Sequence, residues 1–379
     1  MRRFLVVLAA CGHPPAKPTA ITDVTANVSD TEVERRQRME TELQDDILSS
    51  YERDELPDLD TDLVDPRVGP ARVGVGPGDV LFGPEVRERA SSRWPIRVDQ
   101  TTKTAVRSKR LDIHLSADKA VSAAWMSDEL SWRISFCGRT AVIPLRITAL
   151  YAHDGDRWVQ VLEHLSFGRT PQPSPDGALL GRPMTDALID TSLSDELGRE
   201  IVALFSGQSD RVRPLVALDP DHRTEDDPRQ PAPSFLLAPD PDSEWHGDDD
   251  LARLQLVDGR LVKIQDRRVG VIGRSVAKAT VAYMVANLVV DLRTHPGSPA
   301  SQVLLRGTFV FEKRKDAWLM VQGHVSQPTT DYALANRVFG TALESVNLER
   351  GEALRVTCDD GSRPTALTAP APQPAAGSR

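Results

Sequence analysis

The sequence lacks the features that mark several specialised classes of protein. Its 379 residues include only three cysteines, too few for a scaffold held together by disulfides. It contains no run of about 20 apolar residues, so no transmembrane helix is expected. It also has no cluster of Lys and Arg to set against its net charge of −9, and nucleic acid is therefore not an expected partner.

Motifs of familiar catalytic and metal sites are also missing. The sequence contains no His-Glu-x-x-His, no Gly-x-Ser-x-Gly and no Cys-x-x-Cys. The acidic residues from Asp240 to Asp250 do not form an EF-hand loop, because Trp245 and Leu251 occupy positions that require Gly and Glu. We therefore expect neither a bound metal nor a cofactor.

The most informative feature that is present is an internal repeat. Eight residues between 145 and 166 recur 160 positions later without any slip of the frame. They are Leu145, Arg146, Thr148, Asp156, Trp158, Val161, His164 and Ser166, matched by Leu305, Arg306, Thr308, Asp316, Trp318, Val321, His324 and Ser326. A constant offset over eight identities indicates that one domain has been duplicated.

Each copy shows the same order of predicted elements. Met39, Leu43, Ile47 and Tyr51 are spaced by four residues, which predicts an amphipathic helix. From 110 to 169 the residues alternate as they do in strands, with turn signals between them. The second copy repeats a helix followed by strands. The pattern predicts an α+β fold in which N-terminal helices pack on an antiparallel, curved sheet.

The composition sets the expected boundaries of these units. We expect the first domain at 30–170, a linker at 171–184 and the second domain at 185–347. The remaining 348–379 ends in a Pro- and Ala-rich stretch and is expected to be a disordered tail.

The N-terminus predicts an export signal. Residues 1–10 combine two arginines with a short apolar run, and Leu8-Ala9-Ala10-Cys11 resembles the lipobox of bacterial lipoproteins. The resemblance implies cleavage before Cys11, acylation of its sulfur and a tether at 11–29. It also implies anchoring in the cell envelope, in the outer membrane of a Gram-negative host because residue 12 is not Asp. The alternative is an ordinary or uncleaved apolar start with a coincidental cysteine. Pairing of Cys137 with Cys358 stays open.

A family resemblance rests on short motifs in both copies. Glu244-Trp245-His246-Gly247 and the spacing Trp158-x-x-Val161-x-x-His164-x-Ser166 resemble the SnoaL-like branch of the nuclear transport factor 2-like superfamily. The resemblance implies two tandem cone-shaped domains. It says little about activity, since the superfamily holds isomerases, cyclases and dehydratases as well as binding and assembly domains.

The repeated residues and the aromatic residues near them are the candidate pocket or interface. They are Trp125, Arg146, Trp158, His164, Tyr283, Arg306, Trp318 and His324. Family members commonly pair sheet to sheet, so we expect the copies to form a pseudo-dimer that buries the four aromatic residues between the sheets. Alternatively, these aromatic residues cover each sheet separately. His164 and His324 are expected to be structural, with a general acid or a ligand contact as the alternative.

No catalytic residue can be assigned from the sequence. Asp128, Glu129, Asp291 and Tyr151 are the candidates for acid–base chemistry, but neither Asp128 nor Glu129 is repeated, since Ala286 and Asn287 replace them. We therefore favour a non-catalytic binding or assembly module that is anchored to membrane lipid. Its expected partner is a protein or a small apolar ligand. The alternative is an isomerase- or cyclase-like enzyme, or a ligand carrier, that uses one cone. The second cone is favoured as the site of such an activity, because the first cone lacks the Trp-x-Gly motif.

The lipid anchor gives a direct prediction. Replacing the acceptor, Cys11→Ser, removes the thiol to which the lipid would be attached, so the protein is expected to move from the membrane fraction to the soluble fraction. Immunoblotting of fractionated cells measures this change. A variant that stays with the membranes would contradict the lipoprotein hypothesis.

Overall fold

The computed structural model describes a large part of the chain. The described residues are 27–53, 62–89, 94, 103–136, 139–168, 171, 184, 187–188, 190–205, 234–240, 244–246, 259–273, 275–293, 297–314, 317–328, 356–359 and 363–366. Cys11 and Cys137 lie outside them, so lipid attachment stays a prediction and the pairing of Cys137 with Cys358 stays open. Below, residues 27–168 are the first half and 184–328 the second half. No helix within the described ranges is long and apolar enough to cross a membrane.

The first half contains two helices and one sheet. Its helices are α1 (Asn27–Arg53) and α2 (Pro84–Arg89). Its strands are β1 (Ala71–Val73), β2 (Val80–Phe82), β3 (Lys103–Leu115), β4 (Ala123–Phe136), β5 (Arg139–His153) and β6 (Trp158–Ser166). They form one sheet in the order β2-β1-β6-β5-β4-β3, in which only the β1–β6 pair is parallel.

The second half has a matching sheet. It contains α3 (Thr191–Phe205), a short 3-10 helix at Val276–Lys278, and the strands β7 (Ala187–Leu188), β8 (Phe235–Leu237), β9 (Glu244–His246), β10 (Gly259–Val271), β11 (Val281–Leu292), β12 (Ser301–Arg314) and β13 (Ala317–Ser326). Their order is β7-β10-β11-β12-β13-β8-β9, and β8 pairs with β13 in parallel as β1 does with β6. The α+β prediction is therefore confirmed, and both sheets share one topology apart from the added β7.

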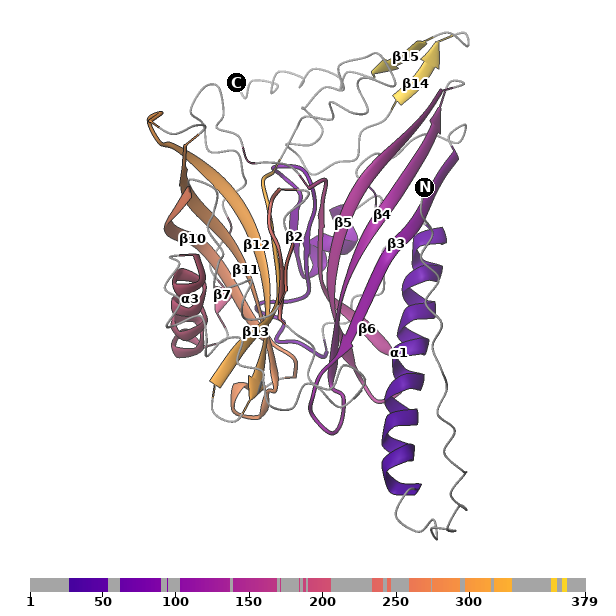
Figure 1. Cartoon of the computed structure of the whole chain (residues 1–379), viewed down its shortest axis with the longest axis vertical. Coiled ribbons are helices and arrows are strands. Elements are labelled where there is room, and N and C mark those ends of the chain that lie inside the picture. The colour runs from indigo at the N-terminus through magenta and orange to yellow at the C-terminus, as the bar shows by residue number, and fades with distance from the viewer. Residues whose placement is uncertain are drawn as a thin grey trace, which may run out of the picture.

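Each sheet is covered by a helix on one side and by the other sheet on its opposite side (Figure 1). We call these the helix-facing side and the inter-sheet side. The face of α1 that was predicted from four-residue spacing packs on the helix-facing side of the first sheet, where Leu43 and Ile47 are buried among Met126, Leu130 and Ile147. In the second half, Leu197 and Ile201 of α3 pack in the same way on Met284 and Leu288. Each helix therefore closes a separate core.

A third core lies between the sheets and joins the two halves. Trp125, Leu150 and Val161 of the first half cluster there with Tyr283 and Val310 of the second. In β4 and β11 the even-numbered apolar residues face the helix and the odd-numbered ones face the other sheet, as strand alternation requires. Where the two sheets meet, the strands therefore carry apolar residues on both faces.

A β-bulge occurs at the same place in both halves. In the ladder between β5 and β6, Leu150 pairs with Leu162 but Tyr151 pairs with Gln160, so Val161 is an extra residue. In the ladder between β12 and β13 the extra residue is Val321. A bulge inverts the alternation of the strand beyond it. Trp158 therefore points to the opposite side from His164, which a straight strand would not allow.

The tail differs from expectation at two short segments. Val356–Asp359 (β14) and Arg363–Ala366 (β15) pair as an antiparallel hairpin inside the region that was expected to be disordered. Val356, Thr357 and Thr365 are β-branched, and such residues favour strands over the disorder that the surrounding Pro and Ala predict. At the other end, α1 begins at Asn27, three residues before the expected domain boundary at residue 30.

Candidate functional site

Two histidines stack at the centre of the inter-sheet contact. His164 of β6 and His324 of β13 have ring centroids 3.8 Å apart and an interplanar angle of 19°. Both side chains are fully buried. They occupy equivalent positions in the two copies, so the point between the rings lies where a two-fold axis relating the halves would pass.

The hydrogen bonds around the two rings are reciprocal. His164 Nδ1 lies 3.0 Å from Thr308 Oγ1 and its Nε2 lies 2.7 Å from Ser326 Oγ. His324 Nδ1 lies 3.0 Å from Thr148 Oγ1 and its Nε2 lies 2.9 Å from Ser166 Oγ. A neutral imidazole has one donor and one acceptor nitrogen, and a hydroxyl can serve either role. All four ring nitrogens are therefore satisfied by the opposite half.

Two repeated arginines extend this symmetry. Arg146 donates from Nη1 to the carbonyls of Ala238 and Asp240 in the second half, both at 2.9 Å. Arg306 donates from Nη1 to Gly76 O in the first half at 2.5 Å and from Nη2 to Pro77 O. Each arginine thus holds a loop of the other half. The loop that Arg306 contacts is the Gly- and Pro-rich segment 74–78. No strand–helix context in the sequence marks this segment as a phosphate-binding loop.

Burial controls the charge at this contact. Desolvation, together with the nearby positive charge of Arg306, lowers the pKa of His164 to about 3. Desolvation and the neighbouring His164 also lower the pKa of His324. Burial lowers the pKa of Arg306 to about 10, which still leaves it protonated at neutral pH. The contact therefore holds two neutral imidazoles between two charged arginines.

The structure separates the aromatic residues that were expected between the sheets. Trp125 and Tyr283 lie in the inter-sheet core, where the Tyr283 hydroxyl donates to Gly69 O at 2.8 Å. Trp158 and Trp318 instead lie on the helix-facing sides, and Trp158 Nε1 donates to Met39 O of α1 at 3.2 Å. The expectation for Trp158 and Trp318 was wrong because the bulges at Val161 and Val321 turn these residues to the other side of the sheet.

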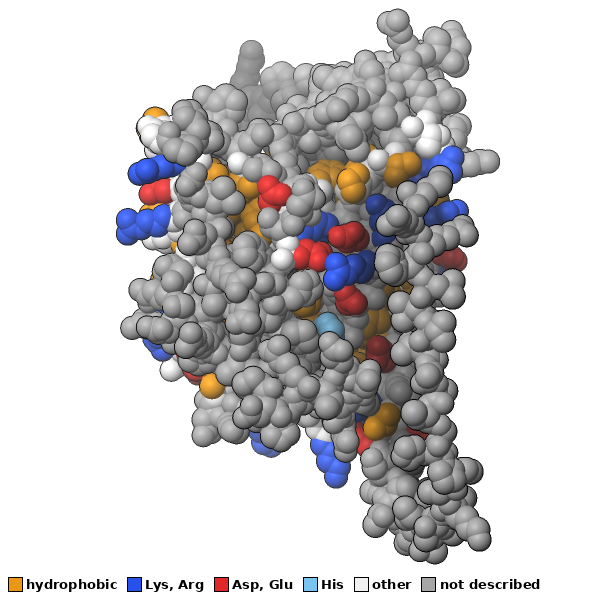
Figure 2. Space-filling view, in the orientation of Figure 1, with side chains coloured by type: hydrophobic (Ala, Val, Ile, Leu, Met, Phe, Trp, Pro, Cys, Tyr) orange, Lys and Arg blue, Asp and Glu red, His pale blue; other side chains and the backbone are white. Residues whose placement is uncertain are grey.

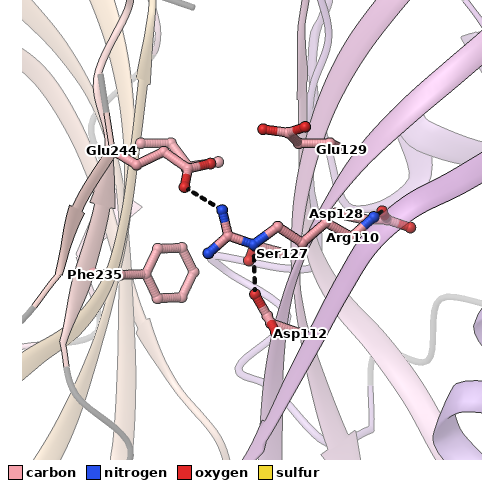
Figure 3. Close-up of a pocket in the computed structure, with 8 residues that line it drawn as sticks. Arg110, Asp112, Ser127, Asp128, Glu129, Phe235 and Glu244 are labelled. Atoms are coloured by element: carbon pink, nitrogen blue, oxygen red, sulfur yellow. Dashed lines mark hydrogen bonds and ion pairs between the residues drawn. The ribbon is translucent and has the colours of Figure 1, made fainter. Parts of the chain in front are cut away.

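A small crevice opens at the edge of the inter-sheet contact. Its lining includes Arg110 of β3, Ser127 and Glu129 of β4, and Phe235 and Glu244 of the second half. Arg110 Nη1 lies 3.0 Å from Glu244 Oε2, which joins the halves by an ion pair (Figure 3). Acidic and basic side chains gather near the middle of this face of the molecule (Figure 2). Arg110 also pairs with Asp112 at 3.5 Å. It is the only basic residue of the lining, which also contains the acidic residues Asp112, Asp128, Glu129 and Glu244, so acidic groups predominate in the crevice.

The candidate acid–base residues do not converge. Asp128 lies on the helix-facing side of the first sheet, while its neighbour Glu129 lines the crevice. Tyr151 belongs to the core under α1. Asp291 lies near the end of β11 in the second half, opposite Arg260 and Gln302. Asp128 and Tyr151 share the helix-facing side of the first sheet, but Asp128 pairs with Ile147, four residues along β5 from Tyr151. Since Glu129 and Asp291 lie elsewhere, the four groups do not form one catalytic constellation.

Sequence reasoning missed part of the site. Thr148 and Ser166 belong to the repeat, but only the histidines and arginines were singled out as candidates. The repeat itself was the signal. A residue with a hydroxyl group that occurs in both copies near a repeated histidine can form a hydrogen bond with the histidine ring. Arg110 and Glu244 are not repeated, and no sequence pattern links two residues so far apart.

Comparisons with known proteins agree with part of this description. Residues 234–330 match the family model described as SnoaL-like domain, so the second half contains such a domain and the resemblance is confirmed there. No curated protein matches the chain.

Several solved structures resemble one part of the chain. An NTF2-like protein with a cystatin-like fold from Novosphingobium aromaticivorans is 14% identical and covers 38% of this chain and 86% of its own, with a TM-score of 0.26. An NTF2-like protein of unknown function from Pseudomonas putida is 10% identical over 38% and 93%, with a TM-score of 0.25. The association domain of CaMKII from C. elegans is 16% identical over 36% and 98%, with a TM-score of 0.23. At these values the likeness adds nothing to the functional reasoning.

The buried histidines predict a pH dependence of stability. Their pKa values are lowered in the folded state from an unfolded value of about 6.5, so the unfolded chain takes up protons first as the pH falls. Stability is therefore expected to be constant above about pH 6.5 and to decrease below it, by at most about 1.4 kcal/mol per pH unit for each histidine. Urea unfolding at pH 7.5, 6.5 and 5.5 measures this.

The control for this prediction is a change in the stacked pair itself. The double variant His164→Gln and His324→Gln should flatten the dependence between pH 6.5 and 5.5, whereas His153→Gln, at a half-buried position beside Trp158, should not. An unchanged slope in the double variant would show that the stacked histidines are not its source.

Proposed function

We propose that this protein is a lipid-anchored envelope lipoprotein whose two halves form one non-catalytic binding or assembly module. The observation that carries the proposal is the use of the repeated polar residues. His164, His324, Arg146 and Arg306 all bond across the inter-sheet contact, together with Thr and Ser partners from the same repeat. Residues already committed in this way are not free to act on a substrate.

The common topology of the halves supports a second SnoaL-like domain. The first sheet has the order β2-β1-β6-β5-β4-β3 and the second contains the matching order β9-β8-β13-β12-β11-β10. The parallel pair occurs at the same place in each, and so does the bulge. The proposal is that 30–170 is a diverged copy of the domain that 234–330 matches, and that the copies pair as subunits of a dimer would.

The N-terminal pattern supports display at a membrane surface. Cys11 follows the lipobox-like sequence, and only residues 12–26 separate it from α1. A chain of this length spans at most about 55 Å. An acylated Cys11 would therefore keep the paired sheets close to the membrane, where a lipid-held surface meets partners in the same envelope.

The crevice is the surface that we assign to a protein partner. Both halves contribute to it, it combines the aromatic ring of Phe235 with partly exposed Arg110 and Asp112, and it lies outside the symmetric contact. Aromatic residues and arginine are among the residue types that protein interfaces favour.

Site-specific photo-crosslinking tests this module role. A photoreactive amino acid at Glu129, inside the crevice, is expected to give a discrete protein adduct in intact cells. The same amino acid at Val262, which is 43% exposed on β10, serves as the control and is expected to give none. Adducts of equal yield at both positions, or no adduct at Glu129, would contradict the proposal.

A further inference from the structure

The two halves differ at the outer edge of two equivalent strands. β10 of the second sheet carries β7 on its outer edge, where Arg268 pairs with Ala187 and Val269 with Leu188 in parallel. β3, the corresponding strand, is the last strand of the first sheet. Within the described ranges, therefore, one half has a strand added to its edge and the other half does not.

The strand pairings show which part of β3 corresponds to the edge that β7 covers. Arg268 of β10 and Asp112 of β3 are equivalent, because their pairings across two ladders lead to Thr308 and Thr148, which form one pair of the repeat. The part of β3 that begins at Asp112 is therefore the equivalent of the β7-binding edge.

The crevice beside Asp112 also has an equivalent place in the other half, and that place is filled. The same pairings relate three residues of the crevice, Phe235, Leu237 and Glu244, to Ala71, Val73 and Val80. The latter three are buried in the inter-sheet core together with Met184, which precedes β7. Met184 N also donates to Asp266 Oδ2 at 3.3 Å, and Asp266 is the equivalent of Arg110. A segment of the chain thus closes this place in the second half through both strand pairing and an apolar side chain.

Only a short part of the β3 edge is suited to accept a strand. Arg107 and Lys109 are exposed, and charged side chains of this kind protect strand edges from pairing. The register also shifts between Ser108 and Arg110, which interrupts the ladder. Beyond the other end of β3, Arg36 of α1 donates to Ser116 O at 2.8 Å. The edge that remains lies next to the crevice and has about the length that β7 covers on β10.

The charges of the crevice indicate the chemistry of its partner. Arg110 is engaged by Glu244 and Asp112, whereas the Glu129 carboxylate has no hydrogen bond or ion pair with any described residue. Figure 3 shows this carboxylate pointing from β4 toward the second half. Asn287, the equivalent of Glu129, is instead satisfied within its own half, since its Nδ2 donates to Asp266 Oδ2 at 2.9 Å. A cation of the partner would complement Glu129.

We propose that the edge of β3 from Asp112 onward binds an extended segment of a partner protein as an added strand. An apolar side chain of this segment would lie against Phe235 at the crevice, and a neighbouring Lys or Arg would face Glu129. Backbone hydrogen bonds of an added strand supply affinity, and its side chains supply specificity. The inference rests on the assignment of the crevice to a protein partner, and it adds the mode of binding and the chemistry of the partner.

Titration of the full-length protein with a fluorescent peptide, followed by anisotropy, tests the proposal. The peptide has the sequence of residues 183–189, Pro-Met-Thr-Asp-Ala-Leu-Ile, with the change Thr185→Lys. In a bound strand that copies β7, Ala187 would lie beside Asp112, so position 185 would lie beside Arg110 and face Glu129. Saturable binding of one peptide per chain is expected. The same peptide with Thr185→Glu should bind about fivefold more weakly, because its carboxylate is repelled.

Protein variants locate the binding. Glu129→Gln removes the negative charge from the crevice and should abolish most of the preference for the Lys peptide over the Glu peptide. The matched control is Asp291→Asn on β11, which makes the same chemical change outside the crevice and should leave both affinities unchanged.

Three results would overturn the proposal. They are equal binding of the two peptides, a preference that Glu129→Gln does not reduce, and no binding at all. The last result would mean that a second copy of the protein or another segment of this chain occupies the edge. If a cross-linked partner were nevertheless found at Glu129 in cells, the module role would stand and only the added strand would be wrong.

Discussion

The structure depends on the mutual satisfaction of buried polar groups between two sheets. Burial between the sheets would leave the ring nitrogens of His164 and His324 unpaired if the opposite sheet did not supply hydroxyl groups to bond with them. Each instead receives a threonine and a serine hydroxyl from the other half, and the surrounding apolar core excludes water from these bonds. The hydrogen bonds specify the register of the halves, and the apolar area supplies most of the stabilisation.

Duplication within one chain explains why the halves could diverge. A symmetric dimer must carry the same residue on both subunits, whereas a tandem chain can change one copy alone. The histidines, threonines and serines at the centre of the inter-sheet contact are repeated, and each contacts its own counterpart or that residue's partners. The helix-facing sides do not touch one another and have become different, polar around Gln160 in the first half and apolar around Met320 in the second.

The sequence predicts the parts of this fold that depend on local pattern. The helix containing Leu43 and Ile47, the alternation along β4 and the paired strands all follow from apolar spacing, and the constant offset of the repeat identifies equivalent residues. The orientation of Trp158 could not be predicted, because the bulge at Val161 leaves no signal in the alternation. The pairing of Arg72 with Glu163, 91 residues later, also depends on the parallel contact of β1 with β6, which only the tertiary structure reveals.

A double-mutant cycle on His164 and Ser326 tests the central claim most directly. These residues come from different halves and are joined by a bond of 2.7 Å. Unfolding free energies of His164→Ala, Ser326→Ala and the double variant should give a coupling energy of about 1 kcal/mol or more, as expected for buried partners in contact. The pair His153 and Ser326 provides the control and should be additive. Additivity within about 0.3 kcal/mol for His164 and Ser326 would contradict the account, because it would mean that the two halves do not share this bond.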